Sequence, residues 1–392
     1  MLALSLEDAR VGMKLAVSVA HPQQPEHDLL RAGYVLEDHV LNRLRDLGVS
    51  ALYIDYPDLA DLDEHFAVSL SPARQAIYQQ MKSSIASVQR NSRPTANFTD
   101  YYSTTRGLIQ TLLDTGRHPI YMDVLSTRMG ADAIAHATAV AHLSLMLGLR
   151  LEEYLIDQRR RLSPQRAREV VNLGVGAMLH DLGKAKLPAD LQRCTDARPP
   201  ADPAQLAAWQ THPQVGYDMI KGGVESTAAA AVLHHHQHFD GSGFAPLKTT
   251  SGTTLRPSGQ QIHIFARIIR AADLVDRLTL GEDGRPRPNV QVLHLLRTRY
   301  AAWLDPSVLS ALEQVVPPFA PGTKVVLSDD TPAIVIGFDA RHPYQPRVRR
   351  MSDQDLQLVG EPVDLATQPS LHIRRAAGLD VEAMIPPLAR AA

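Results

Sequence analysis

The sequence is poor in thiols, in net charge and in long apolar runs. Cys194 is the single cysteine among 392 residues, so an internal disulfide framework is excluded and a reducing compartment is expected. Forty basic and 42 acidic residues leave a net charge of −2, which provides no basic field to attract a nucleic acid polymer. His142 and Ser144 interrupt the most apolar stretch, 137–149, which stays short of the roughly 18 residues of a membrane span. Residues 1–8 lack the basic start of a secretory signal, so we expect a cytoplasmic protein that binds neither membranes nor nucleic acid polymers.

The pattern of apolar residues changes twice along the chain. The first 65 residues combine helical spacing with a strand-like segment, which predicts a small α+β module. Helical patterns dominate up to Pro317-Pro318, after which apolar and polar residues alternate, as is typical of a small β module of the SH3-barrel type. We expect a multi-domain, mainly α-helical chain with an N-terminal α+β module (1–65), a helical connector (66–120), a large helical domain (121–316), a C-terminal β-barrel-like module (317–376) and a tail (377–392).

Histidine is the residue that stands out in number. Nine of the 17 histidines lie between His136 and His263. The His180-Asp181 pair ends an apolar segment, and an imidazole beside a carboxylate can share a metal ion. Four histidines crowd into residues 234–238, which packing alone does not explain. Asp273 falls on an otherwise apolar helix, where a buried carboxylate needs a partner such as a metal.

These residues have the chemistry of a metal site without thiolates. Imidazole and carboxylate ligands favour iron, manganese or zinc over a structural cysteine–zinc site. Seven candidates exceed what one ion needs, and Asp181 could bridge two ions about 3.5–4 Å apart that clamp the oxygens of a phosphoryl displacement. The pattern predicts a metal-dependent phosphohydrolase. Its candidate ligands are His136, His180, Asp181, His212, His235, His236 and Asp273.

Five segments occur in a recognisable order: His136, His180–Lys184, His212-Pro213, His235–Phe244 and Arg267–Thr279. Together they resemble the HD-GYP family, bacterial phosphodiesterases of cyclic di-GMP that form a branch of the HD hydrolase superfamily. The resemblance covers about residues 121–303 and implies an HD-type helical bundle that binds two divalent ions, iron or manganese. It also implies hydrolysis of the 3′-5′ phosphodiester of cyclic di-GMP to pGpG, with GMP as a further product, through a hydroxide activated by two metals.

The resemblance assigns a role to each matching residue. The first ion would be held by His136, His180, Asp181 and Asp273, and the second by Asp181, His212, His235 and His236. Lys184 would direct its ammonium at the scissile phosphate, which makes Asp181 and Lys184 the candidate catalytic residues. Asp132 stands where some members place a glutamate ligand of a third ion, with a surface salt bridge as the competing interpretation. The candidate substrate contacts are Lys184, Phe244, Arg267, Asp276, Arg285 and Arg287.

The sequence departs from the family pattern around the substrate. The family's Gly-Tyr-Pro is replaced by Gly243-Phe244-Ala245, which keeps a ring for stacking on guanine but lacks the phenolic hydroxyl. Gln237 stands where a glutamate usually follows the paired histidines, and Arg277 stands where an alanine is usual. Every expected ligand of the two-ion site is retained.

Two other functions fit the same residues. The altered lip around Phe244 is compatible with a non-catalytic receptor for a cyclic dinucleotide or with a signalling interaction protein. A phosphohydrolase acting on another cyclic nucleotide would need the same ligands. The N-terminal module lacks the acidic pocket of a phosphorylated receiver, so we expect it to form a homodimer or to bind a signalling partner.

Overall fold

The structure is a computed structural model of the 392-residue chain. It describes residues 2–6, 8–21, 24–47, 49, 51–56, 72–90, 98–114, 133–244, 247–248, 254–281, 287–352 and 357–387. The predicted third-ion ligand Asp132 and the predicted substrate contact Arg285 lie outside these residues.

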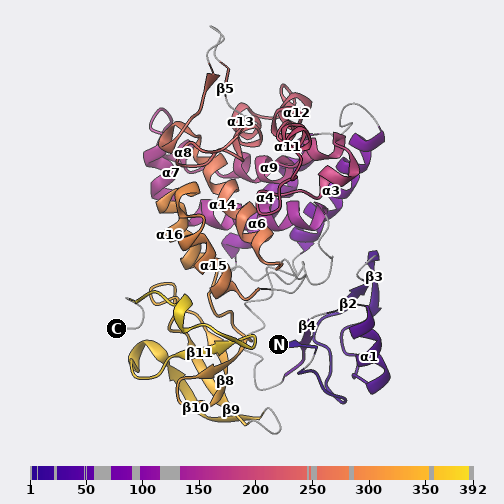
Figure 1. The fold of residues 1–392 in the computed structure, drawn as a ribbon, viewed down its shortest axis with the longest axis vertical. Coiled ribbons are helices and arrows are strands. Elements are labelled where there is room, and N and C mark those ends of the chain that lie inside the picture. The colour runs from indigo at the N-terminus through magenta and orange to yellow at the C-terminus, as the bar shows by residue number, and fades with distance from the viewer. Residues whose placement is uncertain are drawn as a thin grey trace.

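Four apolar helices form the centre of the helical domain, in the upper part of Figure 1. They are α6 (Ala133–Arg150), α9 (Val171–Leu179), α13 (Ser226–His234) and α14 (Ile264–Leu278), and they pack against one another. Their apolar residues are buried on almost every side, because neighbouring helices cover each of them. The mainly helical fold predicted from the sequence is confirmed.

Shorter helices and two long ones surround this centre. The long pair, α3 (Pro72–Arg90) and α4 (Phe98–Asp114), belongs to the same apolar core through residues such as Ile77 and Leu108. The predicted connector therefore packs into the helical domain. The other described helices of this domain are α7 (Glu152–Gln158), α8 (Pro164–Ala167), η2 (Leu182–Lys186), α10 (Ala189–Gln192), α11 (Pro203–Trp209), α12 (His212–Ile220), η3 (Gly259–Gln261), α15 (Asn289–Thr298), η4 (Ala301–Trp303) and α16 (Pro306–Val315). Strand β5 (Leu247–Lys248) pairs antiparallel with β6 (Thr254–Leu255).

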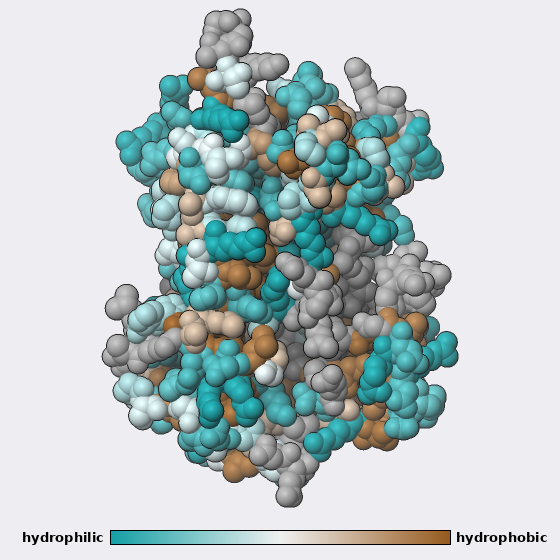
Figure 2. Space-filling model, viewed as in Figure 1, coloured by the Kyte–Doolittle hydropathy of each residue, from teal (hydrophilic) through white to brown (hydrophobic). Residues whose placement is uncertain are grey.

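Helix α6 is long and apolar enough to cross a membrane by length and composition alone. In the structure, however, 78% of its apolar window is buried inside the protein, and it carries the predicted ligand His136. Figure 2 shows a largely hydrophilic surface with scattered apolar residues over the visible face of the helical domain. Helix α6 is therefore the central helix of this domain.

The C-terminal strands form an open sheet. Antiparallel pairing gives the order β10 (Leu358–Asp364), β9 (Arg347–Met351), β8 (Pro332–Gly337), β7 (Lys324–Leu327), β11 (Ile373–Ala376) and β12 (Leu379–Asp380). Among the described residues β10 and β12 are edges that do not pair with each other, so the expectation of a barrel is corrected to an open six-stranded sheet. A local alternation predicts strands, whereas closure depends on pairing between the first and last strands of the sheet.

The N-terminal segment packs against this sheet (Figure 1). Strand β1 (Leu2–Ser5) pairs with β4 (Ala51–Ile54), β2 (Val19–His21) pairs with β3 (Gln24–Leu30), and α1 (Asp38–Asp46) lies beside them. Their buried residues, Leu44 among them, form one apolar cluster with Ile334 and Met351 of the C-terminal sheet. The two ends of the chain thus complete a shared core. The opposite side of the sheet packs with Val290 of α15, which joins it to the helical domain.

Candidate metal centre

The sequence pair His180-Asp181 sits where α9 ends and η2 begins. Gly183 lies so close to α12 that a β-carbon on it would come within 2.1 Å of the His212 carbonyl oxygen. Only glycine tolerates this approach without displacing the backbone. The loop after α9 is therefore held directly against the start of α12, and this contact brings Asp181 beside His212.

Three of the predicted histidine ligands use the same local geometry. Nδ1 of His180 lies 2.7 Å from the Ala177 carbonyl oxygen, and Nδ1 of His235 lies 2.7 Å from that of Val232. Nδ1 of His212 has the same relation to the carbonyl oxygen three residues earlier, at 2.8 Å. A carbonyl oxygen can only accept, so each Nδ1 carries the proton and each Nε2 is left with a free lone pair.

The two other histidines hold their Nδ1 atoms against carboxylates. His136 Nδ1 lies 2.5 Å from Asp276 Oδ2, and His236 Nδ1 lies 2.7 Å from Asp196 Oδ2. A carboxylate behind an imidazole fixes the ring and increases the basicity of Nε2, as it does behind metal-bound histidines. Asp276, predicted to support the site or contact the substrate, has its carboxylate behind the His136 ring. All five imidazoles thus present Nε2 as the donor atom.

The five Nε2 atoms gather in two groups on either side of Asp181. Oδ2 of Asp181 lies 3.6 Å from Nε2 of both His136 and His180. Oδ1 of the same carboxylate lies 3.3 Å from His212 Nε2 and 3.6 Å from His235 Nε2. His236 Nε2 completes the second group, at 3.1 Å from His212 Nε2. The two oxygens of Asp181 therefore face separate groups of imidazoles.

The donor set fits divalent cations. All five histidines are buried, and Asp181 Oδ1 is a buried oxygen without a hydrogen bond among the described residues. Burial lowers the pKa of His180 to about 3 and that of His212 to about 4, so both rings are neutral near pH 7, as a metal ligand requires. Burial opposes the charge of Asp181, but Lys184 and His180 outweigh it and hold the pKa of this carboxyl well below its ordinary value. Neutral imidazoles such as those of His180 and His212 beside ionised carboxylates form a site for a divalent metal. Burial and Arg277 oppose the charged form of His136, but Asp276 and Asp273 outweigh them and raise its pKa.

Asp273 lies at the edge of the first group. Its Oδ1 is 3.2 Å from His136 Nε2 and 4.0 Å from His180 Nε2, as a shared ligand would be. The donor atoms form three sets, and the atoms within each set lie within 4.8 Å of one another. The sets are His136, His180 and Asp181; Asp181, His212, His235 and His236; and Asp196, His236 and Asp273. The sets overlap, because Asp181 belongs to the first two and His236 to the last two.

Two cations contact Asp181 on the side of the first group. Lys184 Nζ lies 2.9 Å from Oδ2, and Arg277 Nη2 lies 2.7 Å from the same oxygen. Burial lowers the pKa of Lys184 even though Asp181 favours its charged form. Lys184 also lies 5.7 Å from the ring centre of Trp209, which encloses it from one side. The predicted catalytic pair is thus in contact, while Arg277 was noted in the sequence only as a departure from the family.

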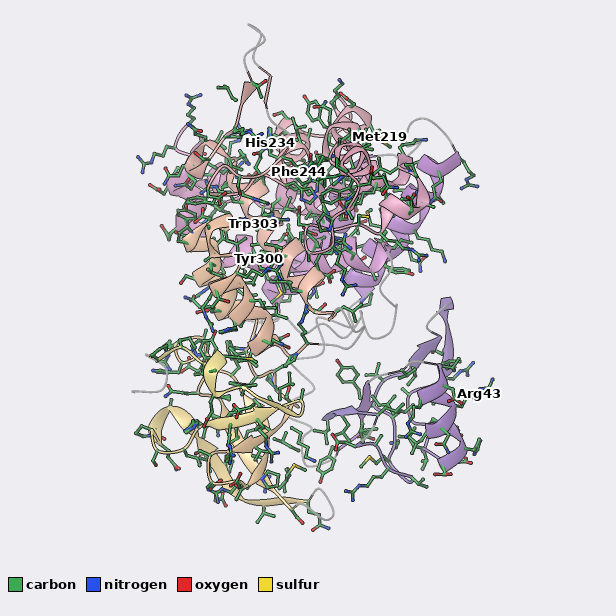
Figure 3. All side chains as sticks on the ribbon, viewed as in Figure 1. Arg43, Met219, His234, Phe244, Tyr300 and Trp303 are labelled. Atoms are coloured by element: carbon green, nitrogen blue, oxygen red, sulfur yellow. The ribbon has the colours of Figure 1, made fainter. Side chains whose placement is uncertain are left out.

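The rim of the site carries Phe244, labelled in Figure 3 within the helical domain. Its ring stacks on His236 with centroids 4.4 Å apart and lies 5.1 Å from Trp209. A β-carbon on Gly243 would fall 2.3 Å from the His236 carbonyl oxygen, so this glycine is needed to hold the segment against the ligand. Gln237 donates to the Phe244 carbonyl oxygen at 2.6 Å. The aromatic ring predicted to stack on a base therefore lies directly over one of the metal ligands.

Two predicted substrate contacts have their hydrogen-bond partners within the protein. Arg267 is buried, and its guanidinium binds the Asp305 carboxylate, the Tyr154 hydroxyl and Gln158. This corrects the expectation that Arg267 faces the substrate, because all its identified partners are inside the helical bundle. Arg287 donates to the carbonyl oxygens of Leu278 and Leu280 and so binds the end of α14.

Two functional residues escaped the sequence analysis. Asp196 lies in the proline-rich loop before α11, where no spacing links it to His236. Arg270 contacts Asp196 at 2.5 Å and Asp273 at 3.2 Å, and it is almost completely buried. Its position three residues before Asp273 on one helix was a usable signal, since residues so spaced share a face.

Comparison with known proteins bears on the same residues. An HD-domain family model matches residues 157–308, which include every predicted ligand of the two-ion site except His136. The chain is 25% identical over 355 residues to the cyclic di-GMP phosphodiesterase PA4108 of Pseudomonas aeruginosa, covering 81% of this chain and 78% of that protein. It is 30% identical over 113 residues to the cyclic di-GMP phosphodiesterase response regulator RpfG of Xanthomonas campestris pv. campestris, covering 28% of this chain and 27% of that protein. HD domains bind divalent metals, in agreement with the histidine and aspartate clusters.

Proposed function

We propose that the chain is a metal-dependent phosphodiesterase of the HD-GYP family that hydrolyses cyclic di-GMP. The observation that carries the proposal is the position of Asp181, whose two oxygens face separate groups of imidazole donors. Two divalent cations, for which we propose iron or manganese, would supply an activated water and the positive charge that phosphodiester hydrolysis needs. We propose pGpG as the first product and GMP as a further one.

The residues of the chain prepare this site in defined ways. Asp276 and Asp196 hold the rings of His136 and His236, and backbone carbonyls hold the other three imidazoles, so the donor atoms are oriented before any ion arrives. Lys184 places a buried ammonium beside Asp181, where a phosphate oxygen of the substrate would gain a charge-assisted hydrogen bond. Phe244 offers an apolar ring at the rim for a purine base.

The proposal is tested with the full chain loaded with Mn²⁺ or, under anaerobic conditions, with Fe²⁺. Cyclic di-GMP is added, and pGpG and GMP are separated by chromatography. We expect turnover by the unmodified chain and a loss of about 100-fold or more in Asp181→Asn, the order expected when several kcal/mol of transition-state charge stabilisation are removed. The matched control is Asp190→Asn, which changes an exposed aspartate of the same domain.

Three outcomes would decide between the alternatives. Binding of cyclic di-GMP without turnover at any metal loading would support the receptor function in place of catalysis. Turnover of another cyclic nucleotide, but not of cyclic di-GMP, would reassign the substrate. Equal turnover by Asp181→Asn and the unmodified chain would remove the proposed role of the site.

We propose in addition that the N-terminal module forms the contact with a second copy of the chain or with a signalling partner. A cavity of about 240 Å³ opens between β3 and α1, lined by residues that include Leu29, Val40 and Arg43, the last labelled in Figure 3. Arg43→Glu places an opposite charge at this exposed rim. Light scattering after size-exclusion chromatography would detect a dimer and its weakening by Arg43→Glu. An unchanged dimer would place the contact elsewhere.

A further inference from the structure

The metal centre has a first half, formed by His136, His180, Asp181 and Asp273, and a second half, formed by Asp181, His212, His235 and His236. The two halves differ in the side chains that contact Asp181. Asp181 Oδ2, which faces His136 and His180, contacts both Arg277 and Lys184. Asp181 Oδ1, which faces His212 and His235, is buried and has no hydrogen bond among the described residues. In the first half two cations thus contact the shared carboxylate directly, whereas in the second half Arg270 contacts Asp196 and lies beside His236 but not Asp181.

Arg277 also stands between the two carboxylates of the first half. Its Nη2 lies 2.7 Å from Asp181 Oδ2 and its Nε lies 3.4 Å from Asp273 Oδ1. Both oxygens lie near the same two histidines, His136 and His180. A cation bound by His136, His180, Asp181 and Asp273 would need both oxygens as ligands. It would therefore have to replace the guanidinium on at least one of them.

The electrostatics of the site point the same way. Asp181, Asp196, Asp273 and Asp276 bring four carboxylates to the centre, and Lys184, Arg270 and Arg277 bring three cations. The carboxylates are therefore largely compensated before a metal binds. Removing Arg277 would leave four negative groups against two positive ones, a stronger attraction for a divalent cation.

We propose that Arg277 competes with the cation of the first half, so that the two halves fill in order. The second half, formed by Asp181, His212, His235 and His236, binds its ion first. The first half binds an ion only when Arg277 leaves Asp181 and Asp273. About a fifth of the Arg277 side chain is exposed, so the guanidinium has solvent to move into. This inference rests on the proposed metal centre, but it is independent of which nucleotide the enzyme hydrolyses.

The test is a Mn²⁺ titration of the metal-free full chain. Unbound Mn²⁺ is followed by electron paramagnetic resonance, so the readout is occupancy and not activity. The unmodified chain is expected to bind one equivalent tightly and the second more weakly. Arg277→Ala is expected to tighten the second step by about tenfold or more, while the first step changes little. Arg277→Lys keeps the positive charge but loses the planar guanidinium. Its affinity for the second Mn²⁺ ion is expected to lie between those of the unmodified chain and Arg277→Ala.

The controls separate competition from a structural role. Arg168→Ala removes an exposed ion pair with Glu152 in the same domain and should leave both steps unchanged. Circular dichroism verifies that each metal-free variant is folded. The proposal would be overturned if the dissociation constant of the second step in folded Arg277→Ala were within twofold of that of the unmodified chain. Weaker binding in that variant would also overturn it, because Arg277 would then assist the ion. Failure to hydrolyse cyclic di-GMP would affect the proposed function without altering this titration.

Discussion

The carboxylate of Asp196 lies 2.7 Å from Nδ1 of His236, although the two residues come from different parts of the chain. Arg270 contacts the same carboxylate at 2.5 Å, which adds a charge-assisted hydrogen bond behind the ring. This pair fixes the orientation of one imidazole of the second half of the metal centre. The other two histidines of that half, His212 and His235, are fixed by backbone carbonyls, which no substitution can remove.

Asp196→Ala is therefore expected to weaken the second half selectively. Loss of a carboxylate behind a metal-binding imidazole typically lowers metal affinity by about 10- to 100-fold. We expect a loss of that size in the tighter step of a Mn²⁺ titration. Asp190→Ala, a nearby exposed aspartate, is the matched control and should bind like the unmodified chain. An unchanged tighter step in Asp196→Ala would show that His236 does not depend on this carboxylate.

Arg267→Ala is expected to destabilise the helical domain without altering substrate affinity. The substitution leaves the buried Asp305 carboxylate without its ionic partner, and breaking such a pair costs about 3–5 kcal/mol. Denaturant unfolding followed by circular dichroism measures the loss of stability, with Arg168→Ala as the exposed control. If Arg267→Ala kept full stability and raised the KM for cyclic di-GMP, the substrate contact first expected from the sequence would be restored.

Ile334→Ala is expected to loosen the N-terminal segment. Ile334 is fully buried in the cluster that the C-terminal sheet shares with β1 and β4, and truncating a buried isoleucine to alanine costs about 2–5 kcal/mol. Val335, its neighbour on β8, is equally buried but belongs to the cluster on the other face. Hydrogen exchange of Leu2–Ser5 should therefore accelerate in Ile334→Ala and not in Val335→Ala. Equal acceleration in both variants would argue against a shared core.

The free energy of unfolding of the metal-free chain is expected to decrease as the pH is lowered. His263, which lies outside the predicted ligand set, allows the contribution of one residue to be measured. His263 accepts from the Phe265 amide at the start of α14, and burial lowers its pKa to about 4 from 6.5. Between these values the unfolded chain binds a proton that the folded chain does not, so the free energy of unfolding decreases as the pH falls through this range. One such group contributes up to about 1.4 kcal/mol per pH unit.

His263→Asn keeps a side-chain acceptor at the helix start but cannot titrate. Urea unfolding of the metal-free chain at several values between pH 7 and pH 4 should give a shallower dependence in this variant. Parallel curves for the variant and the unmodified chain would mean that the folded protein protonates His263 as readily as the unfolded one.

The sequence alone determined the chemistry of the centre and the main class of the fold. Ligand types and their order are read directly from residues such as His180 and Asp181, and helical periodicity is a local property of the chain. The open edge of the C-terminal sheet could not be predicted in this way, because alternation within a strand does not report which strands meet. The same limit applies to the core that the two ends of the chain share.

Tertiary structure decided how the centre is arranged. It placed Asp276 behind His136 and Asp196 behind His236, and it directed the Arg267 guanidinium to Asp305 inside the helical bundle. It also set Arg277 against Asp181 in one half of the centre only. These are contacts between side chains on different elements, and they arise from the packing of helices and loops whose relative positions no local pattern encodes. The residue types therefore follow from the sequence, whereas the asymmetry between the two halves follows from the fold.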